Sequence, residues 1–293
     1  LVDNPCEWLV VDSYQATEEY LQRLNEICPV LYLDDFGKEG YNVTAVLHYG
    51  VVQNQEKYAR GYSQRGVQAL VGAEYIPLRE EFQPAHLAEL QEKHLTVSRR
   101  QEEGSDPDSL AGRPAILITT GGTDPYHVTE QVLKCCLNDQ IFHGYHYHVV
   151  VGSMNDHIQE LQQMAEKYAV NGVSPISLHF GVKHMADLMC RCDYAVSAGG
   201  TTLYELCACG VPTVCFSFSD NQLPAVRLLE QKQIMHYAGD ARGGEIAAEI
   251  GMYLKAYVED PAEAEQYRER MKQLVDGRGV WRIAGFLCQN TNN

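Results

Sequence analysis

The sequence is short of basic residues and lacks any long apolar run. Its 293 residues include 23 Lys and Arg against 39 Asp and Glu, which gives a formal net charge of −16. A surface of this sign repels the phosphates of nucleic acid, so we expect no nucleic-acid partner. No apolar stretch approaches the ~20 residues that span a bilayer, and no signal-peptide pattern opens the sequence. These absences predict a cytoplasmic protein with no transmembrane segment.

The Cys-x-x-Cys motif is absent as well, although the sequence has ten cysteines. Four of them form two Cys-x-Cys pairs in apolar stretches, Cys190 with Cys192 and Cys207 with Cys209. We interpret these as small buried side chains rather than metal ligands, with their thiols reduced. His143, His146 and His148 lie close together in the sequence, but no acidic or thiol partner is spaced to complete a site. We predict neither a metal nor a cofactor.

The sequence contains a repeated alternation of predicted strands and helices. Continuous apolar segments at 8–12, 29–35, 43–47 and 69–71 predict strands, and helical periodicity at 17–27 separates the first two. This order is typical of a parallel sheet that is covered on both faces.

The composition changes at residues 98–114, which are charged, rich in Gly, Ser and Pro, and without apolar periodicity. This segment predicts a linker. After it, five βα units in about 120 residues predict a doubly wound domain. We therefore expect two α/β domains, at 1–97 and 115–293, with the last helix, at 261–275, packing back on the first domain.

The most informative motif follows a predicted strand of the second domain. Gly199 and Gly200 make a tight turn, and a helix begins near Thr201 and Thr202. Glycines let the backbone approach a ligand closely, and a helix N-terminus offers unpaired N–H groups with partial positive charge. The motif fits a phosphate cradle, and equally an ordinary βα turn in which Thr202 and Glu205 form a capping box. Glu205 favours the cradle, because a ribose diol beside the phosphates would supply donors for its carboxylate.

A second glycine turn, Gly121-Gly122-Thr123, follows the first strand of the same domain. Asp124 as helix N-cap and Pro125 at the first helical position explain the next residues, but a cap does not require two adjacent glycines. Ligands of open α/β sheets bind at the carboxyl ends of the strands. Both glycine turns can therefore face one cleft.

Two further strand ends carry groups that suit a nucleotide sugar. The backbone near Phe180 and Val182 can pair with the edge of a flat base, although a plain strand end explains it as well. Asn221 and Gln222 offer donors and acceptors for hydroxyl or amide groups. The alternative is a polar loop in which Asp220 caps the next helix.

The run from His179 to Gln222 (HFGVKHMADLMCRCDYAVSAGGTTLYELCACGVPTVCFSFSDNQ) resembles the C-terminal half of nucleotide-sugar enzymes of the GT-B superfamily. It is similar to the family of UDP-sugar hydrolases of pseudaminic acid biosynthesis, and the spore-coat polysaccharide biosynthesis proteins of the same group look similar. Shorter matches spread the resemblance over nearly the whole sequence, at 8–14, 33–35, 78–82, 121–125 and 276–279.

The resemblance implies a GT-B fold of two Rossmann-like doubly wound domains facing a cleft, with the first domain incomplete. It implies that the backbone near Phe180 and Val182 recognises uracil and that Glu205 binds the ribose hydroxyls. It also implies that the two glycine turns hold or line the diphosphate. Four residues would face the sugar, namely Asn221, Gln222, Asp12 and Tyr14.

The activity implied is metal-independent hydrolysis of a UDP-linked diacetamido-trideoxy sugar, in which water attacks the anomeric carbon and UDP and free sugar are released. The family begins with a Gly-x-Gly-His-x-x-Arg loop whose His activates the water, and this motif does not occur in the sequence. We expect about 60 residues, including this His, to lie upstream of Leu1, which leaves the catalytic residue unknown. Two alternatives remain, a GT-B glycosyltransferase that uses a UDP-sugar donor and a non-catalytic nucleotide-sugar binding module. The expected partner is UDP or a UDP-sugar in each case, and the sequence does not set the oligomeric state.

Overall fold

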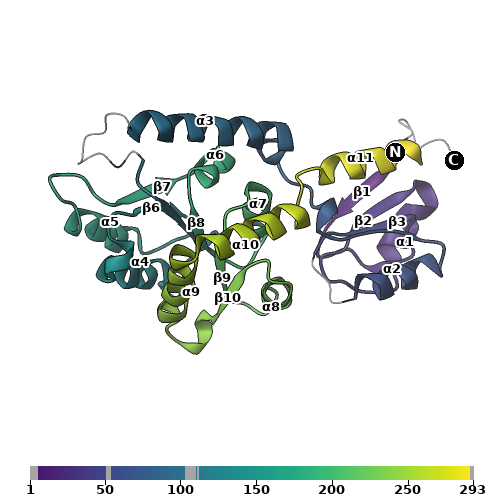
Figure 1. Ribbon diagram of the computed structural model, residues 1–293. Helices are drawn as coiled ribbons and strands as arrows, with labels where there is room; N and C mark the ends of the chain where they lie inside the picture. The colour runs from purple at the N-terminus through teal and green to yellow at the C-terminus, as the bar shows by residue number, and fades with distance from the viewer. Residues whose placement is uncertain (1–5, 51–53, 103–109, 111, 291–293) are drawn as a thin grey trace. The chain divides into compact units, whose positions relative to one another are not determined.

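The computed structural model describes residues 6–50, 54–102, 110 and 112–290, which divide into two compact units (Figure 1). Unit 1 comprises Leu1–Leu78 together with Val275–Asn293, and unit 2 comprises Arg79–Leu274. Each unit has its own parallel sheet, so the α/β class expected from the sequence is confirmed.

Unit 1 has a four-stranded sheet in the order β1-β2-β3-β4, with all strands parallel. The strands are β1 (Leu9–Asp12), β2 (Val30–Leu33), β3 (Ala45–His48) and β4 (Gln68–Val71), and the helical segments are α1 (Glu18–Ile27), α2 (Gln55–Ser63) and η1 (Ala73–Tyr75). β3 is buried along its whole length, whereas β1 is half exposed because it lies at an edge. Tyr32, Tyr58 and Tyr62 pack on one face of this sheet.

The other face of the unit 1 sheet is covered by α11 (Gly279–Gln289), a helix that the sequence analysis did not predict. Phe286 and Leu287 pack against Leu31 and Leu47, and the Phe286 ring lies 5.6 Å from the Trp8 ring. The helix expected at 261–275 corresponds to α10 (Pro261–Leu274), which belongs to unit 2, whereas α11, which follows it, belongs to unit 1. Gly277 and Arg278 separate α10 from α11, and Gly279 begins the new helix.

Unit 2 has a six-stranded parallel sheet in the order β10-β9-β8-β5-β6-β7. Its strands are β5 (Ala115–Thr119), β6 (His146–Val151), β7 (Ile176–Phe180), β8 (Tyr194–Ala198), β9 (Thr213–Ser217) and β10 (His236–Asp240). The chain builds β5, β6 and β7 outward in one direction and then returns to place β8 on the other side of β5. This is the doubly wound Rossmann order, with its topological switch point between β5 and β8. The first five strands confirm the predicted ones, and β10 was not predicted.

Helices connect and cover the strands of unit 2 (Figure 1). They are η2 (Glu80–Phe82), α3 (Pro84–Glu102), α4 (Val128–Asn138), η3 (Gln140–Phe142), α5 (Ile158–Lys167), α6 (Met185–Cys190), α7 (Thr202–Cys209), α8 (Leu223–Gln231), η4 (Ala241–Gly243), α9 (Ala247–Glu259) and α10. α3 extends five residues into the expected 98–114 linker, because SRRQE contains neither Gly nor Pro to end a helix. A search of the described helices finds none with the length and hydropathy of a membrane span.

Gly279, the first residue of α11, is required by a close backbone contact inside unit 1. A Cβ at this position would lie 2.1 Å from the carbonyl oxygen of Ile76. We expect Gly279→Ala to lower the free energy of unfolding by about 1–3 kcal/mol, measured by urea denaturation, because α11 must shift away from the sheet.

The matched control is Gly285→Ala in the same helix, where an added Cβ meets no heavy atom within 4 Å. Alanine favours a helix over glycine, so this variant should be as stable as the parent or up to about 1 kcal/mol more stable. Equal losses in both variants would show that the contact with Ile76 is not what restricts position 279.

Candidate functional site

The two predicted glycine turns lie at the carboxyl ends of neighbouring strands. Thr119, the last residue of β5, pairs with Ser197 of β8, so the turns that follow these strands leave the sheet at the same edge. This edge is the topological switch point of the sheet, where open α/β folds bind their ligands. The structure therefore brings Gly121 and Gly122 together with Gly199 and Gly200.

The helix after the second turn, α7, begins without a side-chain cap. Its N-cap residue is Thr201, whose side chain makes no capping hydrogen bond, and the Leu203 N–H donates to the Gly200 carbonyl at 3.1 Å. In the described part of the chain, the backbone N–H groups of Gly200, Thr201 and Thr202 donate to no protein acceptor. They form a set of donors at the positive end of a helix dipole, which suits an anion.

The N-terminus of the helix after the first turn, α4, is capped by the side chain of Asp124. Asp124 is buried, and its two carboxylate oxygens accept from the N–H groups of Val128 and Thr129 at 2.9 Å each. The expected cap by Asp124 is thus present, but the helix begins at Val128, so Pro125 is not at the first helical position. His127, with φ of 55°, makes the intervening turn. Of these two helix N-termini, only that of α7 has no side chain that caps its first N–H groups.

Gly199 and Gly121 are restricted to glycine for different reasons. A Cβ on Gly199 would lie 2.9 Å from side-chain atoms of Gln222 and Val226, so Gly199 allows α8 to pack closely. Gly121 has φ of +80°, which disfavours other residues. Gly200 has neither restriction, since an added Cβ there would meet nothing within 4 Å. Its absent side chain leaves space beside the free N–H groups.

A further glycine, Gly152, supports the first turn and was not predicted as a site residue. A Cβ on Gly152, just after β6, would lie 2.2 Å from the Gly121 carbonyl oxygen. Two residues further on, the Met154 N–H donates to the Gly122 carbonyl at 3.0 Å. The loop after β6 therefore fixes the position of the Gly121-Gly122 turn. The signal was a glycine directly after a predicted strand.

Glu205 lies one turn into α7 and does not form a capping box with Thr202. Its carboxylate instead accepts from the Arg79 guanidinium at 3.0 Å. Arg79 also pairs with Glu81 at 2.9 Å, and Glu81 accepts from the Ala186 N–H at the start of α6. Burial raises the pKa of Glu205, and the Arg79 guanidinium opposes that shift. Arg79 is a member of the site that sequence analysis quoted only within a family motif.

The other predicted nucleotide and sugar residues of unit 2 lie at neighbouring strand ends. Phe180 ends β7, an edge strand separated from β5 by β6, and Phe180 is exposed. The Gln222 side chain accepts from the Phe218 N–H at 2.9 Å, and that of Asn221 accepts from the Ser219 hydroxyl at 2.6 Å. Asp220 does not cap α8, because it forms an ion pair with Arg242.

Asp12 and Tyr14 lie in unit 1, where Asp12 ends the edge strand β1 and Tyr14 follows it. Tyr14 is 73% exposed, and its ring contacts that of Phe36 edge-on at 5.4 Å. The charge of Asp35 is the main cause that raises the pKa of Tyr14, and burial raises the pKa of Asp35 itself. These residues share the carboxyl edge of the unit 1 sheet.

A buried carboxylate anchors that edge. Asp34 accepts from the Tyr58 hydroxyl at 2.6 Å and from the Phe36 N–H at 3.0 Å, which satisfies its charge. The buried His48 ring is hydrogen-bonded through Nδ1 to the Asp34 carbonyl. Asp34 lies at the end of the strand predicted at 29–35 and in the family match at 33–35, whereas His48 was not predicted, although its place at the end of a buried strand was the available signal.

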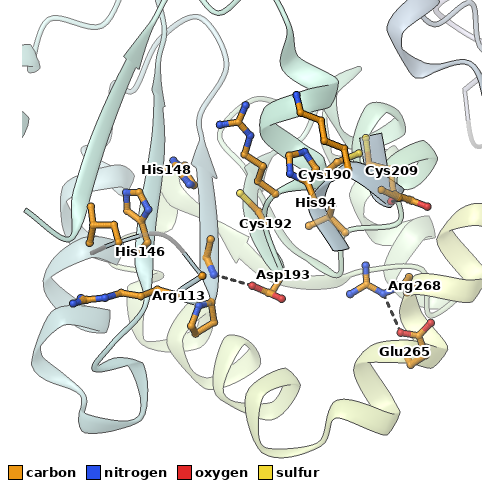
Figure 2. A pocket seen from close by; sticks show the side chains of 18 of the residues that line it. His94, Arg113, His146, His148, Cys190, Cys192, Asp193, Cys209, Glu265 and Arg268 are labelled. Carbon is orange, nitrogen blue, oxygen red and sulfur yellow. Dashed lines mark hydrogen bonds and ion pairs between the residues drawn. The ribbon is translucent and has the colours of Figure 1, made fainter. Parts of the chain in front are cut away.

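A separate cavity of about 1050 Å³ opens at the amino ends of β5, β6 and β8 (Figure 2). His146 and His148 line it, with His146 bonded to the Ser177 hydroxyl and His148 to the His179 ring. Burial is the main cause that lowers the pKa of His146 to about 4 and that of His148 to about 3, so both are neutral near pH 7. Among the described residues, no three His, Cys, Asp or Glu side chains form a metal-binding group. This cavity lies at the opposite edge of the sheet from the glycine turns.

Two parallel sheets, with glycine turns at the switch point of the larger one, define a GT-B glycosyltransferase-like fold. The chain matches MurG of Acinetobacter baumannii with a TM-score of 0.59 and 12% identity, over 93% of this chain and 69% of MurG. It matches Anabaena Alr3699/HepE in complex with UDP-glucose with a TM-score of 0.52 and 14% identity, over 97% of this chain and 79% of that one. Likenesses at these identities establish the fold alone.

The chain is a distant homologue of the spore coat polysaccharide biosynthesis protein SpsG of Bacillus subtilis. The two are 24% identical over 290 residues, which cover 95% of this chain and 75% of SpsG. An uncharacterized protein of Methanocaldococcus jannaschii, MJ1062, is 24% identical over 208 residues, which cover 70% of this chain and only 39% of that protein. No protein-family model matches the sequence.

Asp124 is expected to stabilise the start of α4. Asp124→Ala removes both acceptors of the Val128 and Thr129 N–H groups, so the free energy of unfolding should fall by about 1–2 kcal/mol in urea denaturation. The control is Asp156→Ala, whose side chain is 82% exposed and should contribute less than about 0.5 kcal/mol. An Asp124 variant as stable as this control would contradict the capping role.

Proposed function

We propose that this chain binds a UDP-sugar in unit 2 and that the protein hydrolyses it, releasing UDP and the free sugar. The observation that carries the proposal is the open N-terminus of α7 at the switch point of the sheet. Its free N–H groups lie beside two glycine turns, and Glu205 lies one turn further along the helix. Distant homology to a polysaccharide biosynthesis protein supports the same class of substrate.

Free N–H groups can bind a diphosphate without surrounding lysines. The chain carries a net charge of −16, so an anionic ligand must find its positive potential locally. Gly200, Thr201 and Thr202 supply N–H donors together with the α7 dipole, which favours negative charge near the helix N-terminus. Arg79 partly neutralises the negative charge of Glu205 and Glu81 near the first turn of α7 by pairing with both carboxylates. These groups would also stabilise the charge that develops on UDP as it leaves.

Glu205 is suited to the ribose of the nucleotide. Its largely buried carboxylate has one cationic neighbour, Arg79, and retains acceptor capacity for two hydroxyl donors. A uridine nucleotide with its phosphates on the α7 N-terminus would present its 2′ and 3′ hydroxyls about one helical turn away. Hydrogen bonds from this diol would offset the burial that raises the pKa of Glu205.

The remaining assignments follow the family resemblance. The backbone near Phe180 and Val182 would recognise uracil, and Asn221, Gln222, Asp12 and Tyr14 would contact the sugar. The proposed substrate is a UDP-linked diacetamido-trideoxy sugar of pseudaminic acid or spore-coat polysaccharide biosynthesis. Water would attack the anomeric carbon with a histidine as general base, and no metal is invoked. The Gly-x-Gly-His-x-x-Arg motif is absent from these 293 residues, so the tests below measure binding of UDP.

Gly200→Ala tests whether UDP lies against the backbone of this turn. An added Cβ meets nothing within 4 Å, so thermal unfolding should not change. It would enter the space beside the free N–H groups, and we expect the Kd for UDP, measured by calorimetry, to rise by about tenfold or more. Gly243→Ala, where the Cβ also meets nothing, should bind UDP as the parent does. Unchanged affinity in Gly200→Ala would refute the cradle.

Glu205→Gln tests the ribose assignment. Loss of hydrogen bonds to a charged acceptor should weaken UDP binding by about 1–3 kcal/mol, a fivefold to 150-fold increase in Kd. The parent should also prefer UDP to 2′-deoxy-UDP, and the variant should lose that preference. Glu81→Gln serves as the control, because Glu81 shares Arg79 but has no proposed ribose contact. If Glu205→Gln lowers the melting temperature and leaves UDP affinity unchanged, Glu205 acts only through its ion pair.

A further inference from the structure

Two cysteines of unit 1 lie side by side although they are 22 residues apart in the sequence. Cys6 precedes β1, and Cys28 is the C-cap residue that follows α1. Their Sγ atoms are 3.0 Å apart, and the Cys28 thiol also donates to the Cys6 carbonyl at 3.1 Å. A disulfide needs an S–S distance of about 2.05 Å, so a movement of about 1 Å would join them.

The two thiols differ in their access to solvent. Cys6 is exposed, whereas Cys28 is only 4% exposed. Burial and the neighbouring Cys6 raise the pKa of Cys28 to about 11, which keeps it as a thiol at neutral pH. A soluble oxidant would therefore meet Cys6 first, with Cys28 already in place as the second sulfur.

Most other cysteines in the described part of the chain are poorly placed for such a reaction. Cys136, Cys192, Cys207 and Cys215 are buried, and burial raises the pKa of each. Cys288 is exposed and provides a comparison for a solvent-accessible thiol.

A second neighbouring pair lies beside the cavity of unit 2. The buried Cys209 is hydrogen-bonded to the less buried Cys190, and this contact is the main cause that lowers the pKa of Cys190 (Figure 2). Cys190 and Cys209 are therefore the natural competitors in an oxidation experiment.

We propose that Cys6 and Cys28 are a reversible redox site that forms an intramolecular disulfide with hydrogen peroxide. The Cys6 thiolate attacks one peroxide oxygen, the O–O bond breaks, and Cys6 becomes a sulfenic acid as hydroxide leaves. The Cys28 sulfur then attacks the Cys6 sulfur, the S–O bond breaks, and the departing hydroxide takes up the Cys28 proton as water. Two thiols lose two electrons in total, and one peroxide becomes two waters. A dithiol reductant reverses the reaction.

The bridge would join the approach to β1 to the approach to β2. β1 is an edge strand that pairs only with β2 in the described sheet, and its first ladder bond runs from the Leu9 N–H to the Pro29 carbonyl at 2.8 Å. Cys6 and Cys28 lie just before these two residues. The disulfide would therefore restrain the fraying of an edge strand whose other end carries Asp12.

The test is peptide mapping of the whole chain after oxidation. The reduced protein is treated with hydrogen peroxide, remaining thiols are blocked with N-ethylmaleimide, and the digest is analysed by mass spectrometry without reduction. We expect a cross-linked peptide pair containing Cys6 and Cys28, which disappears after treatment with dithiothreitol. The oxidised parent should also unfold at a higher temperature than the reduced parent, because the unfolded chain is now constrained.

Cys6→Ser is the main variant, since position 6 is exposed and the substitution should not disturb folding. It should lose both the cross-link and the thermal shift, while Cys288→Ser and Cys190→Ser should retain both. The proposal is overturned if the parent yields Cys6 as a sulfinic or sulfonic acid with Cys28 free, if Cys6 pairs between chains, or if the only cross-link joins Cys190 to Cys209. None of these outcomes depends on whether the chain binds UDP.

Discussion

The proposed binding site of unit 2 depends on the N-terminus of α7, whose first N–H groups no side chain caps. Two helices follow glycine turns at the switch point, and they differ in how their first N–H groups are satisfied. Asp124 closes α4 with two hydrogen bonds, whereas no side chain caps α7. Gly199 brings α8 against this turn, and Gly152 holds the neighbouring turn in place. An acidic chain thus keeps one helix end open to an anion through backbone geometry.

The ion-paired residues near α7 connect this helix to other parts of unit 2. Arg79 bridges Glu205 of α7 and Glu81, and Glu81 in turn accepts a hydrogen bond from the first turn of α6. The cost of burying Glu205 is therefore offset by a charged partner while no ligand is bound. A ligand that contacts Glu205 would therefore affect α7, η2 and α6 together.

Local pattern was enough to predict most of the fold, because buried parallel strands are continuous apolar runs and each glycine turn follows one. It missed β10, whose sequence HYAGD has no apolar run, and α11, which begins at Gly279. The pairing of Arg79 with Glu205 spans 126 residues, so no local spacing reveals it. Asp124 was predicted as a cap from its residue type, but the turn at His127 that moves the helix start depends on a left-handed backbone conformation.

The division of the chain between its two units has a consequence for the order of folding. The sheet face formed by Leu31, Ala45, Leu47 and Leu70 is covered by α11, which the ribosome synthesises after the whole of unit 2. During translation, residues 1–78 have one apolar face uncovered while unit 2 is synthesised and until α11 follows. Unit 1 is therefore completed only when α11 has been synthesised and covers this face.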